Sequence, residues 1–126
     1  MEFIMRISQS ELEVLNIIWN RSGLAASDLY ETLKPETGWS LQTVKTLLAR
    51  LTEKQAIRTE RDGRRFLYYP LITRESYEAQ ATRGFVKRLF GGRAAPLIAR
   101  LAENDDLTDA DISEIEALIA KMKHDR

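Results

Sequence analysis

The fold is decided by residues 40–71, which read SLQTVKTLLARLTEKQAIRTERDGRRFLYYPL. Four apolar residues in the first half recur at helical spacing after Ser40, a favourable N-cap, and predict a helix over 41–54. These residues are Val44, Leu47, Leu48 and Leu51. The second half alternates polar and apolar residues on both sides of Asp62-Gly63, the favoured two-residue hairpin turn. It therefore predicts a β-hairpin with strands over 56–61 and 64–71.

The residues before this stretch predict two more helices. Ser8 and Glu11 form a capping box, which places the start of a helix at residue 9, and its apolar pattern continues to residue 19. Residues 26–33 predict a second helix, ended by Pro35 and Gly38, after a short extended link at Leu24. Three helices followed by a hairpin are the order of a winged helix-turn-helix, so residues 1–72 are expected to form that domain.

Residues 73–126 predict helices only, over 74–90, 94–101 and 109–123, with Gly91-Gly92 ending the first. About 54 residues of amphipathic helix rarely hold a core by themselves, and exposed apolar stripes mark association surfaces. We therefore expect a helical dimerisation domain; the alternative is a monomer whose helices fold back on the winged domain. The expected dimerisation residues are Tyr77, Phe85, Leu89, Leu97, Leu101, Ile112, Ile115, Leu118, Ile119 and Met122.

The composition of the 126 residues argues against most enzyme classes. There is no cysteine, and the single histidine, His124, lies in a charged tail, so thiolate, metal and histidine chemistry are disfavoured. No phosphate-binding loop or nucleophile elbow occurs, and we expect a binding protein, not an enzyme, without a cofactor. Apolar runs are too short for a membrane span, and residues 1–6 lack the apolar core of a secretory signal. The cytoplasm is the expected location.

The formal net charge is zero, but the charge is unevenly distributed. Residues 38–74 contain eight Lys and Arg against three Asp and Glu, a net charge of +5. Residues 101–126 contain three against eight, a net charge of −5. Because electrostatic fields in salt act over about 8 Å, a neutral chain can still present a phosphate-binding face.

This positive segment predicts binding to double-stranded DNA. A helix fits the major groove, where Gln42 can pair with adenine and Lys45 with guanine. A solvated polar face is the plain alternative for the helix, and Trp39 is as consistent with core packing as with a phosphate contact. Lys54 is expected to contact the DNA backbone, as is Arg50. The full set of expected DNA-binding residues is Trp39, Ser40, Gln42, Thr43, Lys45, Thr46 and Arg50 on and before the helix, with Arg61, Arg64 and Arg65 on the hairpin.

Residues 7–19, 39–51 and 66–71 resemble the penicillinase and methicillin-resistance repressors of the BlaI/MecI type. The resemblance continues through Phe85, Gly91-Gly92 and 103–108. It implies a homodimeric transcriptional repressor with an amino-terminal winged helix and a carboxy-terminal dimerisation domain. It also implies an inverted-repeat operator with TACA/TGTA half-sites in front of β-lactamase or related genes. Carried over by position, the recognition-helix residues are Gln42, Thr43, Lys45, Thr46 and Arg50, and the hairpin arginines match the wing.

The resemblance further implies inactivation by a sensor-linked protease that cuts within the dimerisation domain. The family's cleaved bond is Asn-Phe, whereas the matching pair here is Arg100-Leu101. The copper-responsive branch of the family uses cysteines at its tail, so this chain cannot sense copper by that route. Two alternatives stay open, a ligand-gated winged-helix repressor and a winged helix used only for protein contacts.

Overall fold

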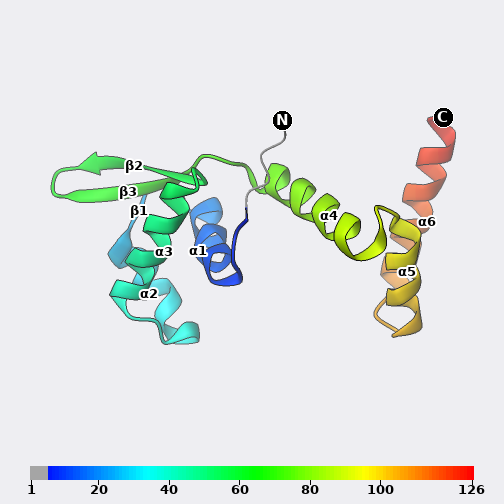
Figure 1. The fold of residues 1–126 in the computed structure, drawn as a ribbon, viewed down its shortest axis with the longest axis horizontal. Coiled ribbons are helices and arrows are strands. Elements are labelled where there is room, and N and C mark those ends of the chain that lie inside the picture. Colours follow the sequence, from blue (N-terminus) through cyan, green and yellow to red (C-terminus); the bar gives the residue numbers. More distant parts are fainter. Residues whose placement is uncertain (1–5) are drawn as a thin grey trace. The chain divides into compact units, whose positions relative to one another are not determined.

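The computed structural model describes residues 6–126, in which six helices and three strands form (Figure 1). The prediction that residues 1–6 lack a secretory signal lies outside the described residues, apart from Arg6. The elements in chain order are α1 (Gln9–Asn20), β1 (Leu24–Ala25), α2 (Ala26–Thr37), α3 (Leu41–Glu53), β2 (Ile57–Asp62), β3 (Arg65–Pro70), α4 (Arg74–Phe90), α5 (Ala94–Glu103) and α6 (Asp109–His124). This order confirms the predicted class, a winged helix-turn-helix followed by helices.

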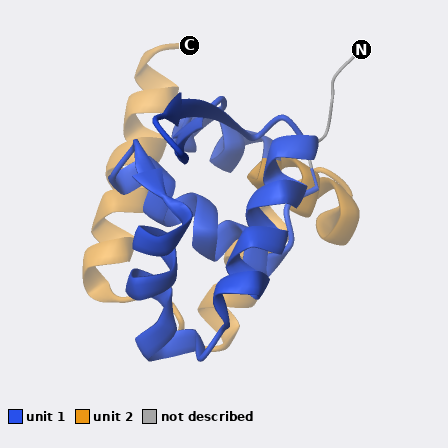
Figure 2. Cartoon of the chain, turned by 90° about the vertical axis from the view of Figure 1, so that its left-hand side faces the viewer, with its two compact units in different colours: residues 1–80 blue, residues 81–126 orange. Residues whose placement is uncertain are grey.

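The chain forms two compact units, one ending at Gln80 and the other beginning at Ala81 (Figure 2). The division falls within α4, whereas the sequence predicts a boundary between residues 72 and 73. Within residues 6–126, no helix combines the length and the apolar character needed to cross a membrane.

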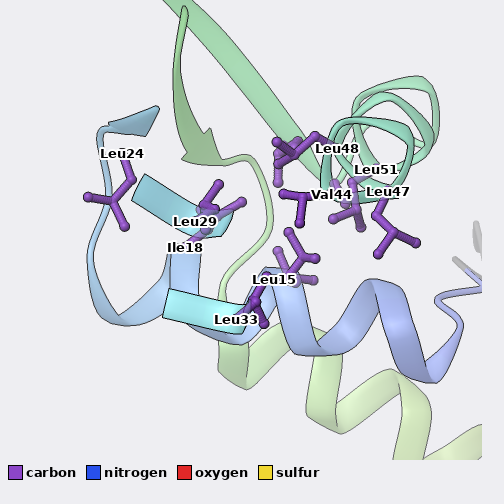
Figure 3. Packing of buried hydrophobic residues seen from close by; sticks show 12 residues of the cluster. Leu15, Ile18, Leu24, Leu29, Leu33, Val44, Leu47, Leu48 and Leu51 are labelled. Atoms are coloured by element: carbon purple, nitrogen blue, oxygen red, sulfur yellow. The ribbon is translucent and has the colours of Figure 1, made fainter. Parts of the chain in front are cut away.

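The core of the first unit is apolar, and its helical residues come from α1, α2 and α3 (Figure 3). The four apolar residues predicted for α3 are all buried. The other helical contributors are Val14, Leu15 and Ile18 from α1 and Leu29 and Leu33 from α2. Each fully buried residue of this size contributes about 1.5–3 kcal/mol of transfer free energy, so this cluster fixes how α3 sits on the unit.

The sheet has three antiparallel strands in the order β1-β3-β2, where the sequence predicted a two-stranded hairpin. Leu24, expected to be a link, pairs with Tyr68, and its neighbour Ala25 pairs with Leu67. The prediction was wrong because a two-residue strand has no periodicity to reveal it. Gly23 turns the chain into β1 with a φ of 84°, and its N–H donates to the Tyr68 carbonyl at 2.9 Å. Any other residue at Gly23 would be strained in this left-handed region.

The hairpin turn is Gly63-Arg64, one residue later than predicted, because Asp62 pairs with Arg65. Gly63 has a φ of 63° and occupies the first central position, as a type II′ turn prefers. The one-residue shift changes every cross-strand partner, so Arg61 lies opposite Phe66.

Helix α2 continues to Thr37 and includes Pro35, which the sequence analysis expected to end it. The turn around the proline is held by other bonds. The Thr37 hydroxyl donates to the Leu33 carbonyl at 2.8 Å, and the N–H of Gly38 donates to the Lys34 carbonyl at 3.0 Å. Gly38, with a φ of 69°, is the C-cap.

The predicted carboxy-terminal helices are confirmed, with α5 and α6 ending slightly later than expected. The N–H of Ser76 donates to the Thr73 hydroxyl at 3.0 Å at the start of α4. A capping box between Thr108 and Asp111 starts α6. Residues 81–126 are all described, and none of them is buried in the single chain.

Candidate nucleic-acid interface

Helix α3 presents one polar face to solvent while its opposite face packs into the core. The residues exposed on and beside the polar face are Gln42, Thr43, Lys45, Thr46, Ala49 and Arg50. The apolar stripe of α3 anchors this face, because Val44 and Leu51 are completely buried and leave the helix no freedom to rotate about its axis. The residues predicted to read DNA are therefore held together on a rigid element.

Three of these side chains are free to bind. Within residues 6–126, the side chains of Gln42, Lys45 and Arg50 form no ion pair and no hydrogen bond. An amide offers both donors and an acceptor, and an ammonium or guanidinium offers only donors. The combination matches the donor and acceptor pattern of base edges and the acceptor oxygens of phosphates.

The hydroxyl groups at the start of α3 are already engaged. The Ser40 Oγ accepts from the N–H of Thr43 at 3.1 Å, and the two hydroxyl oxygens also lie 3.1 Å apart. The Thr46 hydroxyl donates to the Gln42 carbonyl at 2.9 Å. Thr46 therefore has no hydroxyl donor left for a phosphate, and its methyl group is the part that can meet a thymine methyl.

Trp39 lies half-buried against the core cluster, immediately before the N-cap of α3. Its backbone N–H donates to the Thr37 hydroxyl at 3.1 Å. The side chain therefore packs partly against the core, and its contact with a DNA phosphate stays a prediction.

Lys54, expected to contact the DNA backbone, instead binds within the chain. Its ammonium donates to Glu11 Oε1 at 2.6 Å and to the Arg6 carbonyl at 2.7 Å. Burial alone would raise the pKa of the Glu11 carboxyl, but the hydrogen bonds from Lys54 and Ser8 outweigh it and lower the pKa. The pair ties the carboxyl end of α3 to the first turn of α1, and no local sequence pattern marks a contact across 43 positions.

The wing, formed by β2, β3 and their turn, holds the predicted arginines in different surroundings. Arg65 is paired with Asp62 at 3.4 Å. Arg64 sits in the turn, exposed, with no ion pair or hydrogen bond within the described part of the chain. The Nε–H of Arg61 donates to the Gly63 carbonyl at 3.2 Å, which leaves its terminal nitrogens free.

Most of the predicted dimerisation residues are exposed. The strongly exposed ones are Phe85, Leu89, Ile112, Leu118, Ile119 and Met122, and the half-buried ones are Leu97, Leu101 and Ile115. Tyr77 lies in the first unit and packs on Trp19, with ring centroids 5.8 Å apart. Part of the Tyr77 surface is thus covered within the single chain. Arg100 is exposed and lies 3.5 Å from Glu103, and Leu101 follows it within α5.

No metal site forms in the part of the chain described here. Among residues 6–126, no three His, Cys, Asp or Glu side chains gather closely enough to hold a metal ion.

Comparison with known proteins identifies the family of this chain. The model of the family described as penicillinase repressor matches residues 7–121. The chain belongs to the penicillinase repressor family. Members of this family are transcriptional repressors and not enzymes, which confirms the resemblance identified in the sequence.

The penicillinase repressor of Bacillus licheniformis is 31% identical over 124 residues, covering 98% of this chain and 97% of the relative. The methicillin resistance regulatory protein MecI of Mammaliicoccus sciuri is 30% identical over 115 residues, covering 91% of this chain and 94% of the relative.

Two solved structures of the family align with the amino-terminal unit. The solution structure of the DNA-binding domain of the repressor BlaI has a TM-score of 0.54 and 36% identity, covering 61% of this chain and 94% of that domain. The monomeric form of Bacillus licheniformis BlaI, solved in complex with the blaP half-operator, has a TM-score of 0.52 and the same identity and coverage. These matches confirm the winged-helix assignment of the amino-terminal domain of this chain.

Two residues of the wing were missed by the sequence analysis. Arg58 bonds Glu60 at 2.7 Å, and Phe66 is half-exposed beside Arg61. Strand alternation places Arg58 and Glu60 on one face, so that pair could have been found from the sequence. Phe66 could not, because its partner depends on the register of the turn.

Proposed function

We propose that this chain is a homodimeric repressor that binds an inverted-repeat DNA operator through α3 and the wing. The observation that carries the proposal is the exposed face of α3, where Gln42, Lys45 and Arg50 have no partner within residues 6–126. In this proposal Gln42 and Lys45 read base edges and Arg50 binds phosphates, while the wing arginines reach flanking phosphates or the minor groove.

The charge distribution supports the proposal. Residues 38–74, which include α3 and the wing, have eight Lys and Arg against three Asp and Glu. If the dimer neutralises about six to ten phosphates, its affinity falls by roughly 10³ to 10⁵ between 50 and 200 mM salt. The half-sites expected for the family are of the TACA/TGTA kind, and a two-fold dimer matches their inverted symmetry.

The occupant proposed for the apolar faces of α4 to α6 is a second copy of the chain. In the single chain none of residues 81–126 is buried. Even the apolar side chains of Leu89, Leu118 and Met122 are each at least 60% exposed. Soluble monomers rarely leave apolar surface open on this scale. Residues 73–126 are accordingly proposed as the dimerisation domain and residues 1–72 as the DNA-binding domain.

The proposed targets are β-lactamase or related genes. The proposed location of the protein is the cytoplasm. The penicillinase and methicillin-resistance relatives, and the half-operator in the BlaI complex, support this assignment. The proposed inactivation is a cut between Arg100 and Leu101 by a sensor-linked protease, which would divide α5 and separate the two copies.

The experiment that tests DNA binding is a gel shift with the region upstream of the chain's own gene, followed by footprinting. The proposal predicts one protected inverted repeat and a slope of affinity against salt that corresponds to several phosphates. A winged helix that serves only protein contacts would shift no duplex at any salt concentration.

Sedimentation at micromolar concentration tests the dimer, and the same samples test the cut. The intact chain should sediment as a dimer, and a chain nicked between Arg100 and Leu101 should sediment as weakly binding monomers. A strict monomer would contradict the dimer, and a nicked chain that represses normally would contradict inactivation by proteolysis.

The alternative with an observation of its own is ligand gating. An open surface depression of about 330 Å³ lies beside Trp19 at the junction of β3 and α4, lined also by residues 70–75. A thermal-shift screen tests it, and only a compound that raises the midpoint and releases the operator would favour this function.

A further inference from the structure

The wing contains more positive charge than its ion pairs neutralise. Residues 57–70 hold four arginines, one glutamate and one aspartate, a net charge of +2. Arg58 is paired with Glu60 at 2.7 Å and Arg65 with Asp62 at 3.4 Å. The unbalanced charge therefore belongs to Arg61 and Arg64.

Arg61 differs from Arg64 because it has an aromatic partner. It lies opposite Phe66 across the hairpin, and its guanidinium carbon is 5.8 Å from the centre of the phenyl ring. This distance is within the range of a cation–π contact. The Gly63 carbonyl accepts from its Nε–H, so the ring and the turn together restrict the guanidinium. An arginine held in this way loses less side-chain entropy when it binds.

Phe66 is 50% exposed and does not belong to the core cluster or to the residues packed against it, so its ring presents apolar surface to solvent. Strand alternation puts Arg61 and Phe66 on the same face as buried Ile57, farther along the hairpin towards its tip. The opposite face carries a second cation–π pair, Arg58 over Tyr69 at 4.5 Å, but there Glu60 neutralises the arginine. Of these two cation–π pairs of the wing, Arg61–Phe66 is the one that combines a positive charge without an ion pair and exposed apolar surface.

We propose that Arg61 and Phe66 together form a minor-groove contact that reads A·T pairs flanking each half-site. This inference rests on the proposed function, because it assigns part of the operator to the wing. Narrow A·T minor grooves have enhanced negative potential and attract arginine, and phenylalanine is among the side chains that enter minor grooves. The Arg61 guanidinium supplies the charge contact, and Phe66 positions it and packs on the sugars of the groove wall.

Inosine·cytosine pairs separate minor-groove from major-groove recognition. An I·C pair has the minor-groove pattern of A·T, because inosine lacks the 2-amino group, and the major-groove pattern of G·C. The full-length chain is first used to select its preferred duplex from a random pool. The pairs flanking the selected half-sites are then made A·T, G·C or I·C, with the half-sites unchanged, and affinities are measured by gel shift at one salt concentration.

The wild-type chain should bind the G·C-flanked duplex about tenfold more weakly than the A·T-flanked one, and the I·C-flanked duplex as tightly as A·T. Phe66→Ala and Arg61→Ala should each reduce this ratio to about one, while discrimination within the half-sites stays as in the wild type. Arg58→Ala is the matched control. It removes a guanidinium from the opposite face, so it should weaken all three duplexes alike and retain the tenfold ratio.

Several results would overturn the inference. It is wrong if I·C flanks behave as G·C flanks, if the wild type ignores the flanks, or if Phe66→Ala and Arg61→Ala discriminate as well as the wild type. The last two results leave the proposed function intact, because the half-sites are still bound. If the chain selects no duplex at all, the proposed function fails with it. Arg61→Ala, at an exposed position, decides the outcome if Phe66→Ala does not fold.

Discussion

Replacing Lys54 by methionine tests the contact that fixes the carboxyl end of α3. Methionine keeps the length of the aliphatic stem and removes the ammonium that donates to Glu11. The Glu11 side chain is 2% exposed and its Oε2 has no hydrogen-bond partner, so the substitution leaves a buried carboxylate without its counter-ion. Breaking a fully buried pair costs about 3–5 kcal/mol. Because Lys54 is 36% exposed, its removal admits water to the carboxylate, and we expect a loss of about 2–3 kcal/mol in the free energy of unfolding.

The pH dependence of this loss follows from the pKa of Glu11. In the wild type the pKa lies below its ordinary value of 4.5, so the carboxyl stabilises the fold above about pH 4.5 and loses that contribution as the pH falls through the lowered pKa. In Lys54→Met the lowering by Lys54 is lost while burial remains, so the pKa of Glu11 should rise above its wild-type value. The variant is then destabilised most at neutral pH, and the difference from the wild type should shrink as the pH falls from 7 to 4.

Urea unfolding followed by tryptophan fluorescence measures both effects. Trp19 and Trp39 are the two tryptophans of the chain and both lie in the first unit, so the signal reports on the unit that contains the pair. Lys45→Met is the matched control on the same helix, because Lys45 is exposed and should change stability by less than about 0.5 kcal/mol. A Lys54→Met chain as stable as this control at pH 7, or equally destabilised at pH 4, would refute the account of the ion pair.

Three other substitutions test separate parts of the structure. Arg64→Ala removes the unpaired turn arginine and should weaken binding to all DNA sequences alike, reducing the gel-shift salt slope by about one per subunit. Leu118→Asp puts a charge on a residue that is 60% exposed in the single chain, and analytical ultracentrifugation should show monomers with unchanged helix content. Leu51→Ala deletes a completely buried side chain and should cost about 2–5 kcal/mol in urea unfolding. Three results would contradict these predictions: an unchanged salt slope for Arg64→Ala, a persistent dimer for Leu118→Asp, and an unchanged urea midpoint for Leu51→Ala.

The parts of the fold that depend on neighbouring residues could be predicted from the sequence. Ser40 caps α3 and its apolar stripe is buried, and the capping box of Ser8 and Glu11 forms as expected. Signals of this kind act within four residues, so no knowledge of the rest of the chain is needed. The same reasoning placed α4 with the correct ends.

The parts that depend on distant pairing could not be predicted. Strand β1 exists only because Leu24 and Ala25 pair with β3, which lies more than 40 residues later. The position of the turn relative to Asp62 decided that Arg61 would face Phe66, and a shift of one residue is enough to hide that pair. The engagement of Lys54 by Glu11 likewise appears only in the folded unit. The sequence therefore predicts which residues of α3 are exposed, but it does not predict which wing arginines remain without an ion pair.

The central claim, that the exposed face of α3 reads DNA sequence, is tested most directly by Lys45→Ala. Gel shifts should compare the selected operator with a random duplex of the same length for the variant and the wild type. We predict that the variant binds the operator with a loss of about 1–3 kcal/mol and discriminates less at one base pair of each half-site. A variant that binds the operator as tightly and as selectively as the wild type would contradict the claim.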